Sequence, residues 1–376
     1  MILGVDGHRL LGVRSGVARV LEDLLIQLDQ IGHPFDAIRL YSPAPVKDAV
    51  SLGARVHNVV LRGARSMALW QQFALPRAHG RAGLLLCPNY TLPLLVRSPT
   101  LLIHHGSYEG CPEAFPWHQR LRSGLLYGSS AWRASSVITV SEHSRRQMCH
   151  FYRLPESRIR VIPNGVDLQR FYPADEPEAG RAWRTGRLGD DRPWVLYVGN
   201  NNPRRRLSAL VRAFALLVAE HELPHRLIFV GFEIEGTEVL EAARRTGILD
   251  RVHSLGHLES EEVAHCYRAS DVMAYPSIDE GFGLPVLEAM ACGTPVLALD
   301  RAAFPEFAAE AALLLPDAEV STLRHGLETL LLDPSRRAAM RREGKERAVQ
   351  YAWPGIAQQY LDAMLSTLEE GERKPA

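Results

Sequence analysis

Short apolar runs alternate with helical patterns along this sequence, and that alternation limits the fold more than any other feature. The first run, "MILGVD", is followed by a segment whose apolar residues have the spacing of one helix face: Val20, Leu21, Leu24, Leu25 and Leu28. Further apolar runs predict strands at 83–87, 100–104, 136–140 and 160–162. Strands that alternate with helices favour parallel sheets built from β-α-β units.

A polar segment at 174–192, "ADEPEAGRAWRTGRLGDDR", interrupts this rhythm. It carries Pro and Gly and has no sustained apolar period, so we interpret it as an interdomain linker. A second series of strands and helices starts at "PWVLYVG" and includes predicted helices at 207–220 and 261–269. Since 376 residues suit two α/β domains, we predict two Rossmann-like domains facing each other across a cleft, with ligands at the carboxyl ends of strands.

The charge of the chain is unevenly distributed. Its formal net charge is zero, which argues against a nucleic-acid binder, but residues 1–173 carry 20 basic and 11 acidic side chains, a balance of +9. No acid lies between Asp48 and Glu109, a stretch that includes Trp70 and Phe73. The same stretch holds six arginines: Arg55, Arg62, Arg65, Arg77, Arg81 and Arg97. Either this is a solvated basic face, or it docks to an anionic membrane surface or a phosphate-bearing acceptor.

The cysteines and the N-terminus favour a cytoplasmic protein. Five cysteines, an odd number without CxxC spacing, are typical of free thiols in a reducing compartment. The opening "MILGVDGHRL" lacks the basic and long apolar regions of a signal peptide. No apolar run approaches the roughly 20 residues that span a bilayer, so we expect any membrane contact to be peripheral, on the inner face.

Two acids, Glu280 and Glu288, lie eight positions apart in "DEGFGLPVLEAMACGTPV". Glu280 follows the apolar run "DVMAYPS", so its carboxylate is expected at the carboxyl end of a strand. Gly281 and Gly283 allow the backbone to approach a ligand, and Pro285 suits the first position of a helix.

The start of that helix favours an anion such as a diphosphate, because its first N–H groups point outward. Glu288, nearly one turn beyond Pro285, can accept hydrogen bonds from vicinal hydroxyls, and Glu280 can reach a second polyhydroxyl group. A nucleotide-sugar has this pattern of ribose, diphosphate and hexose. On spacing alone, a helix cap with a solvent-facing glutamate remains an alternative.

This stretch resembles the Glu–x7–Glu signature of retaining glycosyltransferases of the GT-B fold, in glycosyltransferase family 4. Three other stretches resemble the same family in order and spacing: "LYVGNNNPRRRLSALVRAF", "ITVSEHSRRQMCHFYRLPESRIRVIPNGVDLQRF" and "YAWPGIAQQYLDAM". The resemblance covers nearly the whole chain and is weakest over 40–95. It implies an acceptor-binding domain at 1–173, a donor-binding domain at 193–350, and a C-terminal helix in 351–376 that crosses back to the first domain.

The resemblance also implies roles for the acidic motif. Glu288 would bind the donor ribose, and Glu280 would bind hydroxyls of the transferred sugar. The backbone N–H groups of the loop between them would meet sugar and diphosphate: Gly281, Phe282, Gly283 and Leu284. Base recognition is expected near His257 and Leu258.

An arginine pair is implied to clamp the diphosphate as it leaves. The family has Arg then Lys in this loop; Arg204 fits the Arg and Arg205 the Lys, so this chain carries Arg where Lys is usual. Which of Arg204, Arg205 and Arg206 contacts the phosphates stays open. Arginine supplies a permanent, bidentate charge that stabilises the developing negative charge.

In the first domain, Gly16 of "RSGVAR" matches a glycine-rich loop that the family has near the donor phosphates, with Arg19 as a companion. His104, at the end of the run "LLIH", is implied to have a positioning or electrostatic role near the reacting sugar. His105 stands where the family often has Asp, so any role of that acid is lost here.

The implied reaction is transfer of a hexose or 6-deoxyhexose from a nucleotide diphosphate to an acceptor hydroxyl, with retention at the anomeric carbon. Family members are thought to react by front-face attack, without a metal or other cofactor. The leading hypothesis is mannosyl- or rhamnosyl-type transfer from a GDP-sugar to a glycan or lipid-diphosphate-linked acceptor, in bacterial surface polysaccharide or lipopolysaccharide assembly.

Two other enzyme activities and one non-catalytic role are alternatives to glycosyl transfer. A pyridoxal-phosphate glycan phosphorylase shares the fold but needs a lysine Schiff base, and none of Lys47, Lys345 and Lys374 ends a predicted core strand. A nucleotide-sugar epimerase of the same fold and a non-catalytic nucleotide-sugar-binding partner subunit both stay open. The sequence does not define the oligomeric state.

Overall fold

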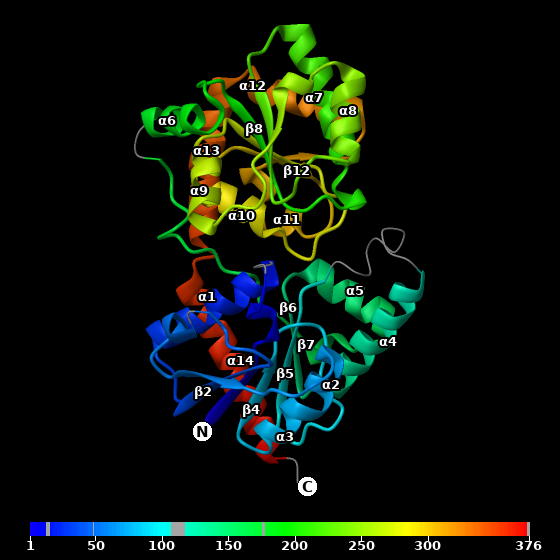
Figure 1. Ribbon diagram of the computed structural model, residues 1–376, viewed down its shortest axis with the longest axis vertical. Coiled ribbons are helices and arrows are strands. Elements are labelled where there is room, and N and C mark those ends of the chain that lie inside the picture. The colour runs from blue at the N-terminus through cyan, green and yellow to red at the C-terminus, as the bar shows by residue number, and fades with distance from the viewer. Residues whose placement is uncertain (13–15, 48, 107–116, 175–176, 374–376) are drawn as a thin grey trace. The chain divides into compact units, whose positions relative to one another are not determined.

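The computed structural model describes residues 1–12, 16–47, 49–106, 117–174 and 177–373. The chain forms two compact units (Figure 1). Unit 1 consists of Met1–Gly165 with Trp353–Ala376, and unit 2 of Val166–Ala352. Each unit is built on one parallel sheet, as the alternating pattern predicts.

The sheet of unit 1 has seven parallel strands in the order β3-β2-β1-β4-β5-β6-β7. The strands are β1 (Ile2–Asp6), β2 (Ala37–Ser42), β3 (Val56–Val60), β4 (Leu84–Cys87), β5 (Thr100–His104), β6 (Ser136–Thr139) and β7 (Ile159–Val161). The winding reverses between β1 and β4, because the chain builds outward from β1 to β3 on one side and from β4 to β7 on the other.

The helices of unit 1 cover both faces of this sheet. They are α1 (Gly16–Ile31), α2 (Met67–Leu69), the π-helix η3 (Trp70–Ala74), α3 (Leu75–His79), α4 (Trp117–Arg133), α5 (Glu142–Tyr152) and α14 (Trp353–Arg373), with short 3-10 turns η1 (His8–Leu10), η2 (Ala49–Leu52) and η5 (Glu156–Arg158). The predicted stripe of α1 is buried. The C-terminal α14 packs on α1, so the end of the chain returns to the first unit, as the resemblance implied.

The sheet of unit 2 has six parallel strands in the order β10-β9-β8-β11-β12-β13. They are β8 (Trp194–Val198), β9 (Arg226–Val230), β10 (Val252–Ser254), β11 (Val272–Tyr275), β12 (Val296–Leu299) and β13 (Leu313–Leu315). The winding reverses between β8 and β11.

The helices of unit 2 are α6 (Pro177–Leu188), α7 (Leu207–His221), α8 (Glu238–Thr246), α9 (Ser260–Arg268), α10 (Leu284–Ala291), α11 (Phe304–Phe307), α12 (Val320–Leu331) and α13 (Pro334–Val349), with 3-10 turns η6 (Pro203–Arg205), η7 (Leu249–Arg251) and η8 (Ala309–Ala311).

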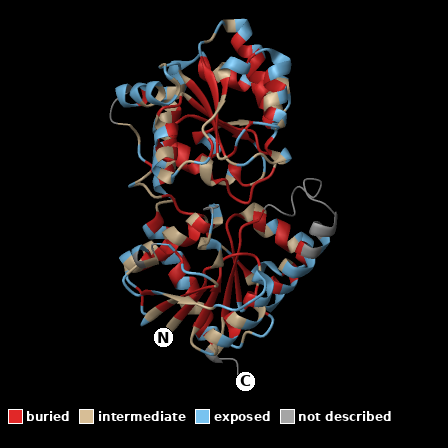
Figure 2. Cartoon of the chain, in the orientation of Figure 1, coloured by how far each residue is buried: buried red, intermediate tan, exposed pale blue. Residues whose placement is uncertain are grey.

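The central strands are buried along their whole length, as Figure 2 shows in red. Every residue of β5, β8 and β9 is buried. A parallel sheet covered by helices on both faces needs continuous apolar runs, which explains why these strands stand out in the sequence. No helix in the described part of the chain combines the length and apolar character that crossing a bilayer requires.

The segment 174–192 differs from the expected linker. It contains α6, which belongs to unit 2, and the division between the units lies at Gly165 and Val166. On α6, Trp183 stacks on His265 of α9 with ring centroids 4.6 Å apart. Gly180 is the one residue of α6 that is fully buried among those whose burial is described, so the helix has too narrow an apolar face to show a period in the sequence.

Candidate active site

The point where the winding of unit 2 reverses lies between β8 and β11. The loop after β8 contains the arginines of "NNNPRRR", and the loop after β11 leads to Glu280. In doubly wound sheets, ligands bind outside the carboxyl ends of strands at such a reversal. Two separate motifs of the sequence therefore meet where the fold favours a ligand.

Glu280 is buried there and faces two arginines. The residue is 6% exposed, its Oε1 forms an ion pair with Arg205, and its Oε2 lies 3.7 Å from Nη2 of Arg204. The hydroxyl of Ser277 donates a hydrogen bond of 2.7 Å to Oε1. These contacts fix both carboxylate oxygens, so Glu280 is a rigid group at the end of β11.

Arg205 is buried between Glu280 and an aromatic stack. Its guanidinium donates to the hydroxyl of Tyr275 and lies 4.8 Å from that ring's centroid, and Tyr197 stacks on Tyr275 at 5.6 Å. Burial alone would lower the pKa of Arg205, but the Glu280 carboxylate outweighs it and raises the pKa above its ordinary value. Arg205 is therefore a fixed cation.

Local turn chemistry places the arginine loop. The side chain of Asn202 accepts a hydrogen bond of 3.2 Å from the N–H of Arg204, which starts η6. Arg206 has a left-handed backbone, with φ of +53°, and turns the chain into α7. The N–H of Ile278 donates to the carbonyl of Arg204 at 3.0 Å and joins this loop to the one after β11. Arg204 and Arg205 thus meet Glu280, whereas Arg206 is exposed.

Glu288 lies on α10 and is 4% exposed. The hydroxyl of Tyr267, on α9, donates a hydrogen bond of 2.9 Å to its Oε2. The alternative of a solvent-facing glutamate is therefore wrong for both acids of the motif, since Glu280 is buried as well.

The loop between the acids needs glycine at its last position. Gly283 has φ of +109°, and a Cβ there would lie 2.7 Å from the ring of Phe304. α10 begins at the next residue, Leu284, with Pro285 in its first turn. Phe282 is buried and stacks on Phe307 at 4.6 Å, so its side chain anchors the loop in the core.

His257 and Leu258 follow β10. Like Glu280, they lie at the carboxyl ends of the strands, but β10 is two strands away from β8. His257 is exposed and Leu258 half-buried. Gly256 before them is packed closely, because a Cβ there would lie 2.5 Å from the carboxylate of Glu233. No hydrogen bond or ion pair described in the structure joins His257 or Leu258 to Glu280 or the arginines.

The other predicted site residues lie in unit 1. Gly16 is exposed and begins α1, which also carries the half-buried Arg19; residues 13–15 of the "RSGVAR" loop lie outside the described residues. His104 ends β5, is fully buried, and contacts the rings of Tyr90, Tyr127 and Tyr152. His104 is thus enclosed by aromatic side chains.

His105 turns to a different partner. Its Nε2 lies 3.0 Å from the carbonyl of Pro88, and burial lowers its pKa to about 4. His105 is therefore neutral at pH 7, and Nε2 donates its proton to that carbonyl.

Unit 1 contains a polar network that the sequence analysis missed. Asp6 ends β1 beside the reversal of the sheet and is 1% exposed. Nδ1 of His8 lies 2.6 Å from Oδ1 of Asp6, and Gln71 donates to Oδ2 at 2.9 Å. Gln71 also donates to the hydroxyl of Thr91 at 2.9 Å. The available signal was an acid directly after the apolar run of the first strand.

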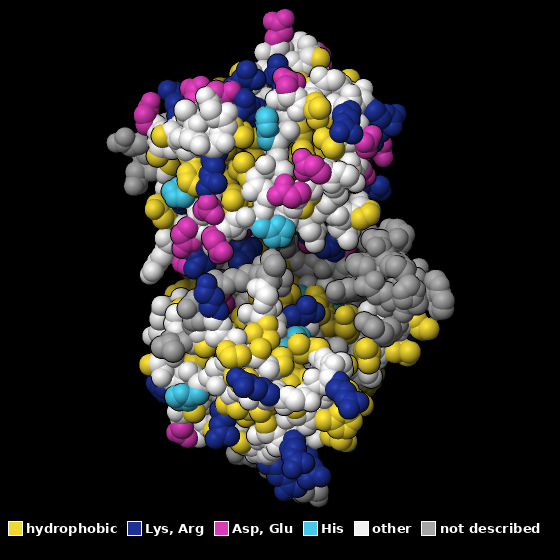
Figure 3. All heavy atoms as spheres, viewed as in Figure 1, with side chains coloured by type: hydrophobic (Ala, Val, Ile, Leu, Met, Phe, Trp, Pro, Cys, Tyr) yellow, Lys and Arg dark blue, Asp and Glu magenta, His cyan; other side chains and the backbone are white. Residues whose placement is uncertain are grey.

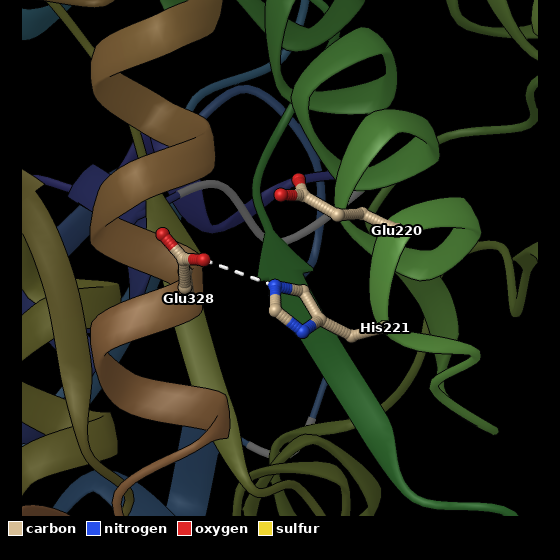
Figure 4. A group of neighbouring side chains, drawn as sticks. All are labelled: Glu220, His221 and Glu328. Carbon is tan, nitrogen blue, oxygen red and sulfur yellow. Dashed lines mark hydrogen bonds and ion pairs between the residues drawn. The ribbon is translucent and has the colours of Figure 1, made fainter.

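One group of His and carboxylate side chains in the described residues is close enough to share a metal ion: Glu220, His221 and Glu328 (Figure 4). Nε2 of His221 lies 3.0 Å from Glu328. The guanidinium of Arg324 already pairs with both acids, at 2.6 Å from Glu220 and 3.2 Å from Glu328. α7 ends here, near the amino ends of the strands, whereas Glu280 lies near their carboxyl ends. We therefore interpret the group as a structural link between α7 and α12.

Comparisons with known proteins identify the family of this chain. A family model described as "Glycosyltransferase Family 4" matches residues 14–170, and one described as "Glycosyl transferases group 1" matches residues 184–347. The two models follow one another along the chain: the first covers most of unit 1 and ends five residues into unit 2, and the second lies within unit 2. The chain belongs to the family 4 type of glycosyltransferases.

Two curated relatives of this glycosyltransferase illustrate the family. The O-antigen chain mannosyltransferase B of Escherichia coli is 28% identical over 277 residues, which cover 73% of this chain and 72% of the relative. The D-inositol 3-phosphate glycosyltransferase of Kineococcus radiotolerans is 32% identical over 259 residues, 63% of this chain. The matched region spans 58% of that second relative's length.

Solved structures show that the glycosyltransferase has the GT-B fold. The sucrose-phosphate synthase of Thermosynechococcus elongatus matches with a TM-score of 0.78 at 22% identity, covering 97% of this chain and 98% of that chain. Anabaena Alr3699/HepE in complex with UDP-glucose matches with a TM-score of 0.78 at 21% identity, covering 98% and 99%. The α/β class and the GT-B fold predicted from the sequence are therefore confirmed.

Proposed function

We propose that this glycosyltransferase transfers a hexosyl group from a nucleoside diphosphate-sugar to a hydroxyl of a glycan acceptor. The main observation behind the proposal is a group of buried charged side chains near the point where the winding of the unit 2 sheet reverses. The group consists of Glu280 with Arg204 and Arg205, and Glu288 on α10. The HepE structure of the same fold was determined with UDP-glucose, which supports a nucleotide-sugar as the donor.

In this proposal Glu288 binds the donor ribose and Glu280 binds hydroxyls of the transferred sugar. Both are acceptors held in place by protein donors, Tyr267 for Glu288 and Ser277 for Glu280. Burial makes hydrogen bonds to such carboxylates strong and selective for hydroxyl groups. Backbone groups of Gly281–Leu284 complete the sugar and diphosphate contacts.

Arg204 and Arg205 would stabilise the diphosphate as it leaves. Fixed cations placed before the reaction lower the barrier, because no reorganisation is needed when negative charge develops. The ion pairs with Glu280 keep both guanidiniums oriented in the meantime. This arrangement supports transfer without a metal ion, since arginine and the α10 N-terminus supply the charge stabilisation that a cation gives elsewhere.

We further propose that transfer retains the anomeric configuration. Glu280 is fixed by Ser277 and Arg205, which suits hydroxyl binding better than nucleophilic attack. Front-face attack assisted by the departing phosphate then needs no enzyme nucleophile, and His104 in unit 1 would have a positioning role.

We propose a mannosyl- or rhamnosyl-type transfer from a GDP-sugar in surface polysaccharide or lipopolysaccharide assembly. The name of one relative, O-antigen chain mannosyltransferase B, supports mannosyl transfer in O-antigen assembly. The acceptor would then be a lipid-diphosphate-linked glycan at the cytoplasmic face of the membrane. On the acceptor side, the network of Asp6, His8 and Gln71 lies at the reversal of the unit 1 sheet, the position at which such sheets bind ligands.

The test is an assay of GDP-mannose, UDP-glucose, dTDP-rhamnose and ADP-glucose, each with and without a lipid-diphosphate-linked glycan, followed by NMR of the anomeric proton. We expect acceptor-dependent consumption of the GDP-sugar, retained configuration, and unchanged turnover in chelator. Isomerisation of donor alone would favour an epimerase instead. Binding of donor without turnover on any acceptor would favour the non-catalytic partner subunit.

A further inference from the structure

Unit 1 exposes large apolar side chains that its own core does not use. Three of them lie on the segment from α2 to η3, namely Met67, Leu69 and Phe73, and two lie in the loop after β4, namely Leu94 and Leu95. Phe73 is 59% exposed, Leu94 65% and Leu95 64%. We call these five residues the Phe73 face. Exposed apolar groups that gather in one place mark interaction surfaces.

The two segments of the Phe73 face are neighbours. The side-chain oxygen of Gln72, next to Phe73, accepts a hydrogen bond of 2.8 Å from the N–H of Leu94. Arg133 of α4 donates to the carbonyl of Pro93 and holds the same loop from the other side. In Figure 3, hydrophobic and basic side chains lie side by side over the part of unit 1 that carries α2 and α3 in Figure 1.

Phe73 lies on the outer side of the π-helix η3. Trp70 and Gln71 of η3 are both buried, whereas Phe73 is 59% exposed. Trp70 is fully buried and its Nε1 donates to the carbonyl of Leu61 at 3.1 Å. Trp70 and Phe73 both lie in the basic stretch of the sequence, but Trp70 belongs to the core and only Phe73 of the two is exposed.

Exposed arginines lie in the same stretch of the chain as the Phe73 face. All six arginines between Asp48 and Glu109 are exposed, and they take part in none of the ion pairs found among the described residues: Arg55, Arg62, Arg65, Arg77, Arg81 and Arg97. Arg55 differs, because it donates to the carbonyls of His33 and Phe35 at 2.8 and 3.1 Å. The segments of the Phe73 face thus combine apolar groups with positive charge, and the sequence has no acid between Asp48 and Glu109.

We propose that the Phe73 face docks on an anionic lipid bilayer. Its apolar side chains would enter the boundary between headgroups and acyl chains, while the surrounding arginines contact lipid phosphates. A second copy of the chain is a poorer occupant, since a two-fold contact would set the arginines of one face against those of the other. The proposal goes beyond glycosyl transfer and can be tested without any donor.

The test is co-sedimentation of the full-length protein with vesicles of phosphatidylcholine alone, or of phosphatidylcholine with an equal amount of phosphatidylglycerol. We expect binding to the anionic vesicles at low salt, and loss of binding at about 1 M salt, where the Debye length is about 3 Å. Equal binding to both vesicle types, or to neither, would overturn the proposal.

Substitutions test whether the residues of the Phe73 face and the nearby arginines bind the vesicles. Phe73→Ser combined with Leu94→Ser and Leu95→Ser should weaken vesicle binding by about tenfold or more, and Arg65→Ala with Arg77→Ala by about fivefold per arginine. The matched control is Leu216→Ser on α7 of unit 2, where Leu216 is 53% exposed; it should bind like the parent.

Each variant should keep the melting temperature of the parent and its response to added nucleoside diphosphate, which separates lost docking from lost folding or lost donor binding. Variants of the Phe73 face that bind vesicles as the parent does would contradict the assignment. Light scattering measures the oligomeric state of the parent and of Phe73→Ser. A parent dimer that Phe73→Ser converts to a monomer would show that a second copy of the chain covers the face, and would overturn the proposal.

Discussion

Glu280 pairs with the buried Arg205 and is proposed to bind the donor sugar, and a single and a double substitution can separate these two roles. In Glu280→Gln the amide can still accept from Ser277, but Arg205 loses its anionic partner while remaining buried. We expect turnover to fall by about 100-fold or more and the free energy of unfolding to fall by about 3 kcal/mol. Enzyme kinetics and denaturant titration measure the two effects.

The matched control is Glu280→Gln combined with Arg205→Gln. Removing both charges should restore much of the lost stability, because the buried guanidinium of Arg205 is no longer left without its anionic partner, while turnover stays low. Full activity in Glu280→Gln would remove this residue from the site.

Tyr267 is predicted to act on the donor through Glu288. Tyr267→Phe removes the hydroxyl that donates to the Glu288 carboxylate at 2.9 Å and should weaken nucleoside diphosphate binding by about fivefold, the value of one hydrogen bond of about 1 kcal/mol. Glu288→Ala should weaken it much more. Calorimetric titration with GDP compares the two; a larger loss in Tyr267→Phe than in Glu288→Ala would contradict the assigned roles.

Burial of His79 makes unit 1 sensitive to acid. Burial lowers the pKa of this imidazole to about 4, below its ordinary 6.5, and its ring lies edge-on to Tyr41. Below pH 6.5 the imidazole therefore binds a proton in the unfolded chain, whereas in the folded chain it does so only near pH 4. The free energy of unfolding is therefore highest above pH 6.5 and decreases as the pH falls toward 4. The loss approaches roughly 3 kcal/mol.

His79→Phe should reduce this acid sensitivity, leaving the share that comes from His105, whose pKa is also about 4. Urea-unfolding midpoints at neutral pH and near pH 4.5 give the comparison. An unchanged difference between the two pH values in His79→Phe would show that His79 is not responsible.

At the level of elements, the sequence predicts the buried strands well. The runs at 83–87, 100–104, 136–140 and 160–162 correspond to β4, β5, β6 and β7 within a residue, because strands covered on both faces must be apolar throughout. Glu280 and Glu288 were found because they flank one short loop. Contacts between distant segments were not: Gln71 reaches Asp6 across 65 positions, and no local pattern encodes that pairing.

The pairing of Arg205 with Glu280 was missed for the same reason. The sequence suggested that the arginines face a diphosphate, and the structure adds that they also neutralise the first acid of the motif. The π-helix η3 and the narrow apolar face of α6 depart from regular helical periods, so both escaped a search for periodicity.

The loop at the start of α10 is predicted to require glycine at position 283. Gly283→Ala would place a Cβ 2.7 Å from Phe304 at a φ of +109°, so the loop must shift, with a stability loss of about 1 to 3 kcal/mol and weaker diphosphate binding. Gly355→Ala in α14 is the control, since nothing lies within 4 Å of its Cβ; its melting temperature should be unchanged or slightly higher. Equal behaviour of the two variants would argue against a constrained loop.

At the scale of the whole molecule, two parallel sheets each have a polar group where the winding reverses. In unit 2 it is Glu280 with its arginines, and in unit 1 it is Asp6 with His8 and Gln71. Unit 1 also holds the basic stretch and the Phe73 face. This division suits an enzyme whose second unit holds a small charged donor and whose first unit meets a larger acceptor and a lipid surface.

The measurement that tests the central claim most directly is a crystal structure of the full chain with GDP or a GDP-sugar. We expect the ribose hydroxyls on the carboxylate of Glu288, the diphosphate between the start of α10 and Arg204 or Arg205, and the sugar hydroxyls on Glu280. A nucleotide bound in the crystal away from the carboxyl ends of β8 and β11, without contact to these four residues, would contradict the account.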